Sequence, residues 1–324
     1  MISVVDERRA LLASWLSEQS SFKGGTLSLA SADASFRRYF RLQSNKKSFI
    51  VMDAPPELED SLPFVQIGKW MKESGINVPE IFAKDLDRGF LVLSDFGDFH
   101  FQDALKNNDP EILYSLAIDQ IVGMQNSLSE SKKNLPTFDP SWQHKELDIF
   151  HEWCLPGVSK EDYRNVTNPL VDAIDQIPKG FMHRDFHCRN LLYCKGQKLG
   201  IIDFQGAMHG PLTYDLVSLL RDCYIDNPPR LVDKKVKDFI HRLKSVNANY
   251  IEITDEEFIR WFDLAGLQRH LKCVGIFHRL KIRDEKPQYL NDVPCVLKYI
   301  NLALERNPEF KSLKDMVEQA TILK

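Results

Sequence analysis

Long apolar runs, paired cysteine motifs and a basic stripe are all missing from this sequence. No apolar run is long enough to span a bilayer, and residues 1–9 lack the basic region and apolar core of a signal peptide. The 6 cysteines form no CxxC pair, so in a chain of 324 residues we expect reduced thiols rather than a disulfide framework. These absences predict a cytoplasmic protein without a membrane partner.

The charge balance and the absence of repeats argue against nucleic-acid-binding proteins and repeat proteins. The formal net charge is −4 and the basic residues are dispersed, so nucleic acid is not an expected partner. There is no internal repeat and no low-complexity segment. A hydrophobic content of 43% over 324 residues is enough for two lobes or one large domain. We expect a monomer or a weak dimer.

The first part of the chain has the pattern of a small sheet. A helix is predicted over residues 4–19 and another over residues 62–73. Alternating apolar runs predict strands over residues 26–30, 37–42, 47–53, 79–83 and 90–93. With about five strands and two helices, the first ~95 residues predict a mostly antiparallel sheet rather than alternating βα units.

The remainder is mainly helical by period and length. Helices are predicted over residues 110–128, 142–155, 162–177, 231–250, 256–282 and 293–306, with strands only near 181–183, 191–193 and 199–203. The predicted fold class is therefore α+β, with an N-lobe at residues 1–94 and a C-lobe at residues 95–324. A cleft between two such lobes is the expected place for a ligand site.

Two of the predicted short apolar strands, the first near 181–183 and the second near 199–203, are followed by or end in polar side chains. Asp185 follows the first run, Asn190 comes five positions later, and Asp203 ends the second run. An Asp, an Asn at this spacing and a second Asp are suited to phosphoryl transfer from Mg-ATP. In this interpretation Asp185 is the catalytic base, while Asn190 and Asp203 are the Mg²⁺ ligands. The alternative for each aspartate is a turn or helix-capping residue.

The same motifs resemble a known superfamily. HRDFHCRN at residues 183–190 and IDFQ at residues 202–205 resemble the aminoglycoside phosphotransferase and choline kinase-like superfamily. Other blocks are similar to the anomeric N-acetylmuramate/N-acetylglucosamine kinase family: DASFRRYFR at 33–41, MDAPPE at 52–57, GPLTYDLVSLLRD at 210–222 and LQRHLK at 267–272. The resemblance implies a two-lobed protein-kinase-like fold. It also implies ATP and Mg²⁺ as cofactors, and phosphorylation of the C1 hydroxyl of an amino sugar in cell-wall recycling.

The N-lobe departs from the protein-kinase pattern at two places. The turn after the first strand has no G-x-G-x-x-G motif, and Met52 stands where kinases carry the phosphate-binding Lys. Candidates for the missing positive charge are Arg37, Arg38 and Lys47. The resemblance implies nucleotide contacts at Ser35, Phe36, Arg37, Leu93 and Asp95, the last two through the backbone of the segment expected to run past the adenine.

Acceptor recognition rests on weaker signals. A sugar carboxylate suits an Arg, which can bind it with two hydrogen bonds. The candidate acceptor-binding residues are His187, Arg189, Arg221, Arg269, Arg279, His270, Glu152 and Trp153. The alternative for each is a structural ion pair, a core edge or a solvated side chain. His183 and Asp215 are expected to support the catalytic loop, although Asp215 is equally suited to capping a helix.

Two rival functions stay open at this point. One is a different small-molecule kinase of the superfamily, acting on an aminoglycoside, choline or another amino alcohol. The other is a pseudokinase-like nucleotide-binding module, for which Met52 is the motivation. The intact Asp185, Asn190 and Asp203 argue against the second rival, and the several arginines argue against a cationic acceptor.

Overall fold

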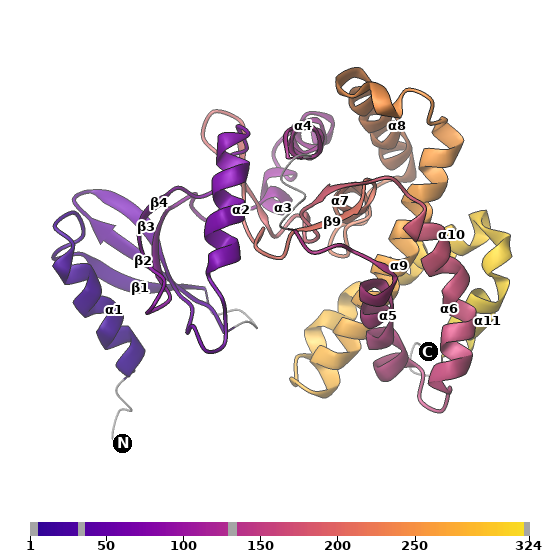
Figure 1. Cartoon of the computed structure of the whole chain (residues 1–324), viewed down its shortest axis with the longest axis horizontal. Coiled ribbons are helices and arrows are strands. Elements are labelled where there is room, and N and C mark those ends of the chain that lie inside the picture. The colour runs from indigo at the N-terminus through magenta and orange to yellow at the C-terminus, as the bar shows by residue number, and fades with distance from the viewer. Residues whose placement is uncertain (1–5, 32–35, 129–134, 321–324) are drawn as a thin grey trace. The chain divides into compact units, whose positions relative to one another are not determined.

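The structure is a computed structural model that describes residues 6–31, 36–128 and 135–320. The chain divides into two compact units, and Figure 1 shows the elements of each. The first unit comprises Met1–Phe99 and Leu192–Gln205, and the second comprises His100–Leu191 and Gly206–Lys324. All six cysteines are free thiols. Within the described ranges, no helix has the length and apolar character needed to cross a membrane.

The first unit is built on a five-stranded antiparallel sheet of order β1-β2-β3-β5-β4. Its strands are β1 (Thr26–Ser31), β2 (Arg38–Ser44), β3 (Lys47–Asp53), β4 (Ile81–Asp85) and β5 (Phe90–Ser94). Buried and more exposed residues alternate along β2, whereas Phe90–Leu93 of β5 are buried on both faces of the sheet. The sheet predicted for this part of the chain is confirmed.

Helix α1 (Glu7–Glu18) covers one face of this sheet (Figure 1). Asp6 caps it by accepting a hydrogen bond from the backbone N–H of Arg9, at 3.0 Å. Trp15 of the helix lies against Phe90, with ring centroids 5.7 Å apart. The core beneath the helix also contains Leu12, Leu16, Phe22, Phe40, Leu42, Phe49, Val51 and Val92.

A second helix, α2 (Leu62–Glu73), packs against the segment Leu192–Gln205, which belongs to the same unit. The strands β7 (Leu191–Cys194) and β8 (Lys198–Ile201) form a hairpin there. Ile201 donates its N–H to the carbonyl of Asn77 at 2.9 Å, and Phe64 of α2 packs on Phe204 with ring centroids 4.8 Å apart. The sequence-based boundary after residue 94 assigned this segment to the second domain, whereas these contacts group it with the first unit.

The second unit is mainly helical. Its helices are α3 (Phe101–Ala104), α4 (Pro110–Ser127), α5 (Pro140–Cys154), α6 (Lys160–Asp175), α7 (Tyr214–Leu220), α8 (Pro229–Val246), α9 (Asp255–Ile282), α10 (Val293–Arg306) and α11 (Lys311–Gln319). Short 3-10 turns are η2 (Ala248–Tyr250), η3 (Pro287–Asp292) and η4 (Pro308–Phe310). The strands β6 (Lys179–Met182) and β9 (Met208–Pro211) pair antiparallel.

Helix α9 is the central element of this unit. A capping box between Thr254 and Glu257 begins the helix, and most of its side chains from Phe258 to His278 are buried. The helix packs closely on α5 at Gly275, which has no side chain. A Cβ at this position would lie only 2.6 Å from the backbone N of Phe150. Figure 1 shows α5, α6, α10 and α11 gathered near α9. The long helix thereby carries polar residues such as Lys272 into the interior.

Candidate active site

The loop between β6 and β7 is fixed from behind by Asp215. The carboxylate of Asp215, near the start of α7, accepts hydrogen bonds from the backbone N–H groups of His183 (2.7 Å) and Arg184 (2.9 Å). Arg184 has a positive φ of 80°, which is unfavourable for a residue with a side chain and is found at functional loops. Burial raises the pKa of Asp215 to about 7, against the two N–H donors, which favour the ionised form.

Asp185 follows Arg184 and lies among positive charges. Burial alone would raise the pKa of Asp185, but Lys272 and Arg184 outweigh this effect and hold it below the ordinary aspartate value. The carboxylate is therefore ionised at neutral pH. An ionised, half-buried carboxylate can accept a hydrogen bond from a hydroxyl, or its proton.

Asn190 is tied to the same loop. Its side-chain Nδ2 donates to the backbone carbonyl of Asp185 at 3.0 Å and lies 3.4 Å from Nε2 of His187. The backbone N–H of His187 also donates to the Asp185 carbonyl, at 3.0 Å. These contacts orient the amide by its nitrogen end. Asp185, His187 and Asn190 thus form one locally ordered group.

Asp203 belongs to the first unit, directly after β8. It is exposed and has a positive φ of 65°, again the left-handed region that a side chain disfavours. Gln205 Nε2 donates to its Oδ1 at 2.6 Å. The next residue, Phe204, is buried against Phe64 of α2, so the neighbouring core holds this turn in place.

The two faces of the sheet separate the cations proposed to replace the kinase lysine. Met52 pairs directly with Tyr39 and Leu91, and directly opposed residues of a ladder share a face. By the alternation along a strand, Arg37 falls on the face of Met52, whereas Arg38 and Lys47 fall on the face covered by α1.

The ion pairs of these cations differ as well. Arg37 is 8% exposed and pairs with Glu59 at 2.9 Å. Arg38 pairs with the buried Asp53 and with Asp6, each at 2.6 Å. Lys47 is exposed. Of the three candidates, Arg37 is the one on the face of Met52.

The other predicted nucleotide residues have varied surroundings. Phe36 is 61% exposed, Leu93 is buried in β5, and Ser35 lies outside the described residues. The Asp95 carboxylate accepts hydrogen bonds from Arg41 Nε (2.8 Å) and from the N–H of Gly97 (2.8 Å). The Asp95 side chain is therefore committed to the first unit, and a nucleotide contact at this position stays a prediction for its backbone.

The predicted acceptor residues fall into exposed and buried groups. Arg189 is exposed and stacks on Tyr224, with Cζ 3.5 Å from the ring centroid. Glu152 is exposed on α5. Arg221 is buried and pairs with Asp263 at 2.7 Å, which favours a structural role.

Arg269 of α9 is also buried. Its Nη1 contacts Sγ of Cys223 at 3.5 Å, and its charge is one of those that lower the pKa of Asp185. A direct acceptor contact by Arg269 stays a prediction.

Sequence reasoning missed Glu146 on α5 and did not assign a role to Lys272 on α9. Glu146 accepts hydrogen bonds from Arg184 Nη2 (2.8 Å) and Lys272 Nζ (3.3 Å), and all but 3% of Glu146 is buried. The partners of Glu146 lie 38 and 126 residues away in sequence, so no local pattern connects them. A charged residue on the apolar face of a predicted helix was the available signal.

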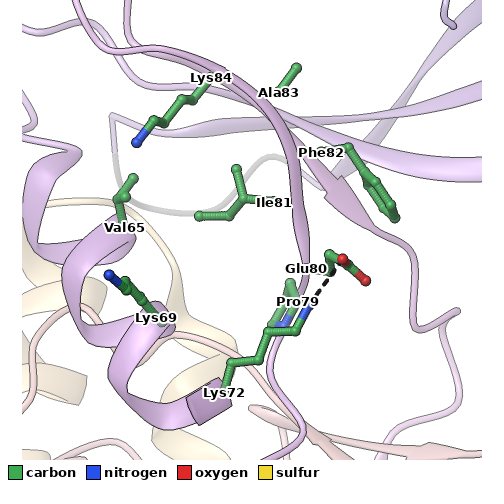
Figure 2. A pocket seen from close by; sticks show the side chains of 10 residues that line it. Val65, Lys69, Lys72, Pro79, Glu80, Ile81, Phe82, Ala83 and Lys84 are labelled. Carbon is green, nitrogen blue, oxygen red and sulfur yellow. Dashed lines mark ion pairs between the residues drawn. The ribbon is translucent and has the colours of Figure 1, made fainter.

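A pocket of about 440 Å³ lies in the first unit between α2 and β4 (Figure 2). Figure 2 shows Lys69 and Lys84 on either side of Val65 and Ile81, with Lys72 paired to Glu80 at 3.1 Å. None of the predicted site residues in the described ranges lines this pocket. The proposed chemistry is therefore not assigned to it.

Comparison with known proteins identifies the family. The sequence profile of the phosphotransferase enzyme family matches residues 26–245. The chain belongs to this family. As a phosphotransferase it is similar to a Pseudomonas putida protein named N-acetylmuramate/N-acetylglucosamine kinase, with 35% identity over 97% of both chains. Proteins of the same name from Pseudomonas aeruginosa (37% identity; 89% of this chain and 86% of the relative) and Neisseria meningitidis (34%; 95% and 94%) are also similar.

Solved structures agree on the fold of the phosphotransferase. Choline kinase LicA from Streptococcus pneumoniae matches with a TM-score of 0.65 at 11% identity, covering 91% of this chain and 99% of the other. Plasmodium vivax ethanolamine kinase matches with a TM-score of 0.65 at 11% identity, covering 93% and 88%. The predicted α+β kinase-like fold, the resemblance to the amino-sugar kinase family and the phosphotransferase class are confirmed.

Proposed function

We propose that this phosphotransferase is an ATP- and Mg²⁺-dependent kinase of amino sugars. Its proposed acceptor is the anomeric (C1) hydroxyl of N-acetylmuramate or N-acetylglucosamine. The observation that carries this proposal is the 34–37% identity, over most of the chain, to relatives named N-acetylmuramate/N-acetylglucosamine kinase. The ordered loop from His183 to Asn190 supports it, because that loop holds the groups that phosphoryl transfer requires.

Asp185 is the proposed catalytic base. Its low pKa keeps it ionised at neutral pH, so it can accept a hydrogen bond from the sugar hydroxyl and direct an oxygen lone pair at the phosphate. Asp215 and His183 support this role through the backbone contacts of the loop. The protein thus contributes mainly orientation and charge, which is the usual contribution in phosphoryl transfer.

Asn190 and Asp203 are the proposed Mg²⁺ ligands. An amide oxygen and a carboxylate are hard ligands, and Mg²⁺ usually takes one or two protein ligands and completes its shell with phosphates and water. The hydrogen bond from Asn190 Nδ2 to the Asp185 carbonyl fixes this side chain to the loop of the proposed base, which supports its place in the site. When bound, the ion would neutralise phosphate charge.

Arg37 is the proposed substitute for the missing phosphate-binding lysine. The alternation of the strands assigns it to the face of Met52, and Glu59 pairs with it as a carboxylate pairs with the lysine of a kinase. Phe36, Leu93 and the backbone at Asp95 are proposed to contact the nucleotide. For the acceptor, we favour His187 and Arg189, since the buried Arg221 already has a partner.

An ATP-consumption assay tests the function. Purified protein is offered N-acetylmuramate, N-acetylglucosamine, choline and an aminoglycoside, each with and without Mg²⁺. We expect turnover on an amino sugar only, lost without Mg²⁺ and reduced about 100-fold or more in Asp185→Asn. Thermal melting of the variant verifies that it folds. Turnover on choline or the aminoglycoside instead would refute the acceptor, and wild-type rates in Asp185→Asn would refute the base.

A further inference from the structure

A buried cluster of charges lies behind the loop that carries Asp185. At its centre is Glu146 of α5, 3% exposed, whose Oε1 faces Arg184 and Lys272. Its Oε2 accepts a hydrogen bond from Gln268 Nε2 at 3.2 Å, and Lys272 Nζ also contacts the hydroxyl of Tyr214 at 3.1 Å. Both Gln268 and Lys272 come from α9, so two long helices meet at this carboxylate.

Stability alone gives a poor account of this cluster. Removing charges from water costs as much as a buried ion pair returns, and apolar replacements of such pairs are often neutral or stabilising. Here one carboxylate faces two cations, Arg184 and Lys272, although one cation would neutralise it. The second cation is instead explained by the neighbouring Asp185, whose charge interacts with Lys272 and Arg184. The cluster is arranged around the loop.

Arg184 connects the cluster to the loop. Two of its nitrogens, Nε at 3.1 Å and Nη2 at 2.8 Å, donate to Glu146 Oε1, and its guanidinium lies over the ring of Trp142, 5.5 Å from the centroid. Its backbone is in the disfavoured left-handed region and its N–H donates to Asp215. Such a conformation persists only where surrounding contacts hold it. The side-chain and backbone contacts of Arg184 together hold the residue that directly precedes Asp185.

We propose that Glu146 and Lys272 are positioning residues, which hold Arg184 and thereby keep Asp185 oriented for phosphoryl transfer. The proposal rests on the proposed function of Asp185. Glu146 accepts the hydrogen bonds of the Arg184 guanidinium, and Lys272 offsets the negative charges of Glu146 and Asp185. Neither residue is required to touch substrate.

The test compares kcat and KM in Glu146→Ala, Lys272→Met and a matched control, Lys235→Met. Lys235 of α8 is also buried, at 2% exposed. It pairs with Glu111 of α4 at 2.9 Å and with Asp238 of α8 at 3.3 Å. We expect kcat to fall about 10- to 100-fold in the first two variants, with KM for ATP within about twofold of wild type. Lys235→Met should reduce the melting temperature without changing kcat. Glu146→Gln and Lys272→Arg, which retain an acceptor and a cation, should restore much of the rate.

A second measurement does not depend on activity. Amide hydrogen exchange of the 183–190 segment should accelerate in Glu146→Ala and Lys272→Met, and stay unchanged in Lys235→Met. Unchanged kcat and unchanged exchange in folded Glu146→Ala would overturn the positioning role, as would equal losses of kcat in Lys235→Met. If wild-type protein turns over no acceptor, the proposed function fails, and the exchange result alone decides whether the cluster orders the loop.

Discussion

Arg37 is the residue that we propose as the cation for phosphate in the first unit. Met52 has no charge and is fully buried, so the third strand offers no cation at the usual kinase position. Arg37 pairs with Glu59 and lies on that face, whereas Lys47 is exposed on the other. Arg37, directly before β2, is therefore the cation proposed to replace the lysine that kinases carry on β3.

Replacing Arg37 by Met should weaken ATP binding with little effect on the chemical step. A charge-assisted hydrogen bond contributes about 1.5–3 kcal/mol, so KM for ATP should rise roughly 10-fold or more. Lys47→Met is the control and should leave KM for ATP unchanged. Steady-state kinetics with varied ATP measures both. Equal KM values in Arg37→Met and wild type would remove Arg37 from the nucleotide site.

At the scale of residues, the sequence supports predictions of function only where the signal is local. Asp185, Asn190 and Asp203 stand out because their spacing and their position after apolar runs are visible in the sequence. Glu146 and Lys272 are not visible, because they meet across 126 residues of chain. The face of the sheet on which Arg37, Arg38 and Lys47 lie also requires the strand register, which composition does not fix.

At the level of elements, strong periodicity predicted most of the secondary structure. The predicted bounds of β3 and α2 agree with the structure, as do those of the long helix α9 within one residue. The short strand β9 (Met208–Pro211) and the helix α11 (Lys311–Gln319) were not predicted. β9 has only four residues, two of them Gly and Pro, and it is a strand because it pairs with β6. The predicted helix at 231–250 is α8 followed by the 3-10 turn η2.

Two glycines of α9 give a matched test of its packing. In Gly275→Ala the new Cβ would lie 2.6–2.7 Å from backbone atoms of Ile149 and Phe150, which cannot move without separating α5 from α9. We expect a loss of about 1–3 kcal/mol in unfolding free energy. In Gly266→Ala the nearest atom is Val217 Cγ1 at 3.4 Å, so this variant should be neutral or gain up to about 1 kcal/mol from helix propensity. Urea denaturation measures both, and equal stabilities would contradict the close crossing.

At the scale of the whole molecule, the first unit is discontinuous in sequence. Leu192–Gln205 returns to it after about 90 residues of the second unit and contributes the hairpin of β7 and β8. Tyr193 N–H donates to the carbonyl of Phe99 at 2.8 Å, and Asn77 Nδ2 donates to the carbonyl of Leu199 at 3.1 Å. The first 99 residues therefore lack part of their own core.

An isolated fragment of residues 1–99 should be less stable than the same fragment joined to residues 192–205 by a Gly/Ser linker. Loss of Phe204 alone uncovers Phe64, and exposure of one such side chain costs about 1.5–3 kcal/mol. Circular dichroism melting of the two proteins measures the difference. The expectation fails if both melt at the same temperature, which would mean that the returning segment adds nothing to the first unit.

The return of Leu192–Gln205 also affects how the chain is made. Domains generally fold during synthesis as their residues leave the ribosome. Here the first unit stays incomplete until the segment with Asp203 has been translated, and that segment is synthesised after His183 to Asn190. The nascent chain therefore passes through a stage in which all five strands of the sheet have been synthesised, but Phe64 of α2 still lacks its partner Phe204.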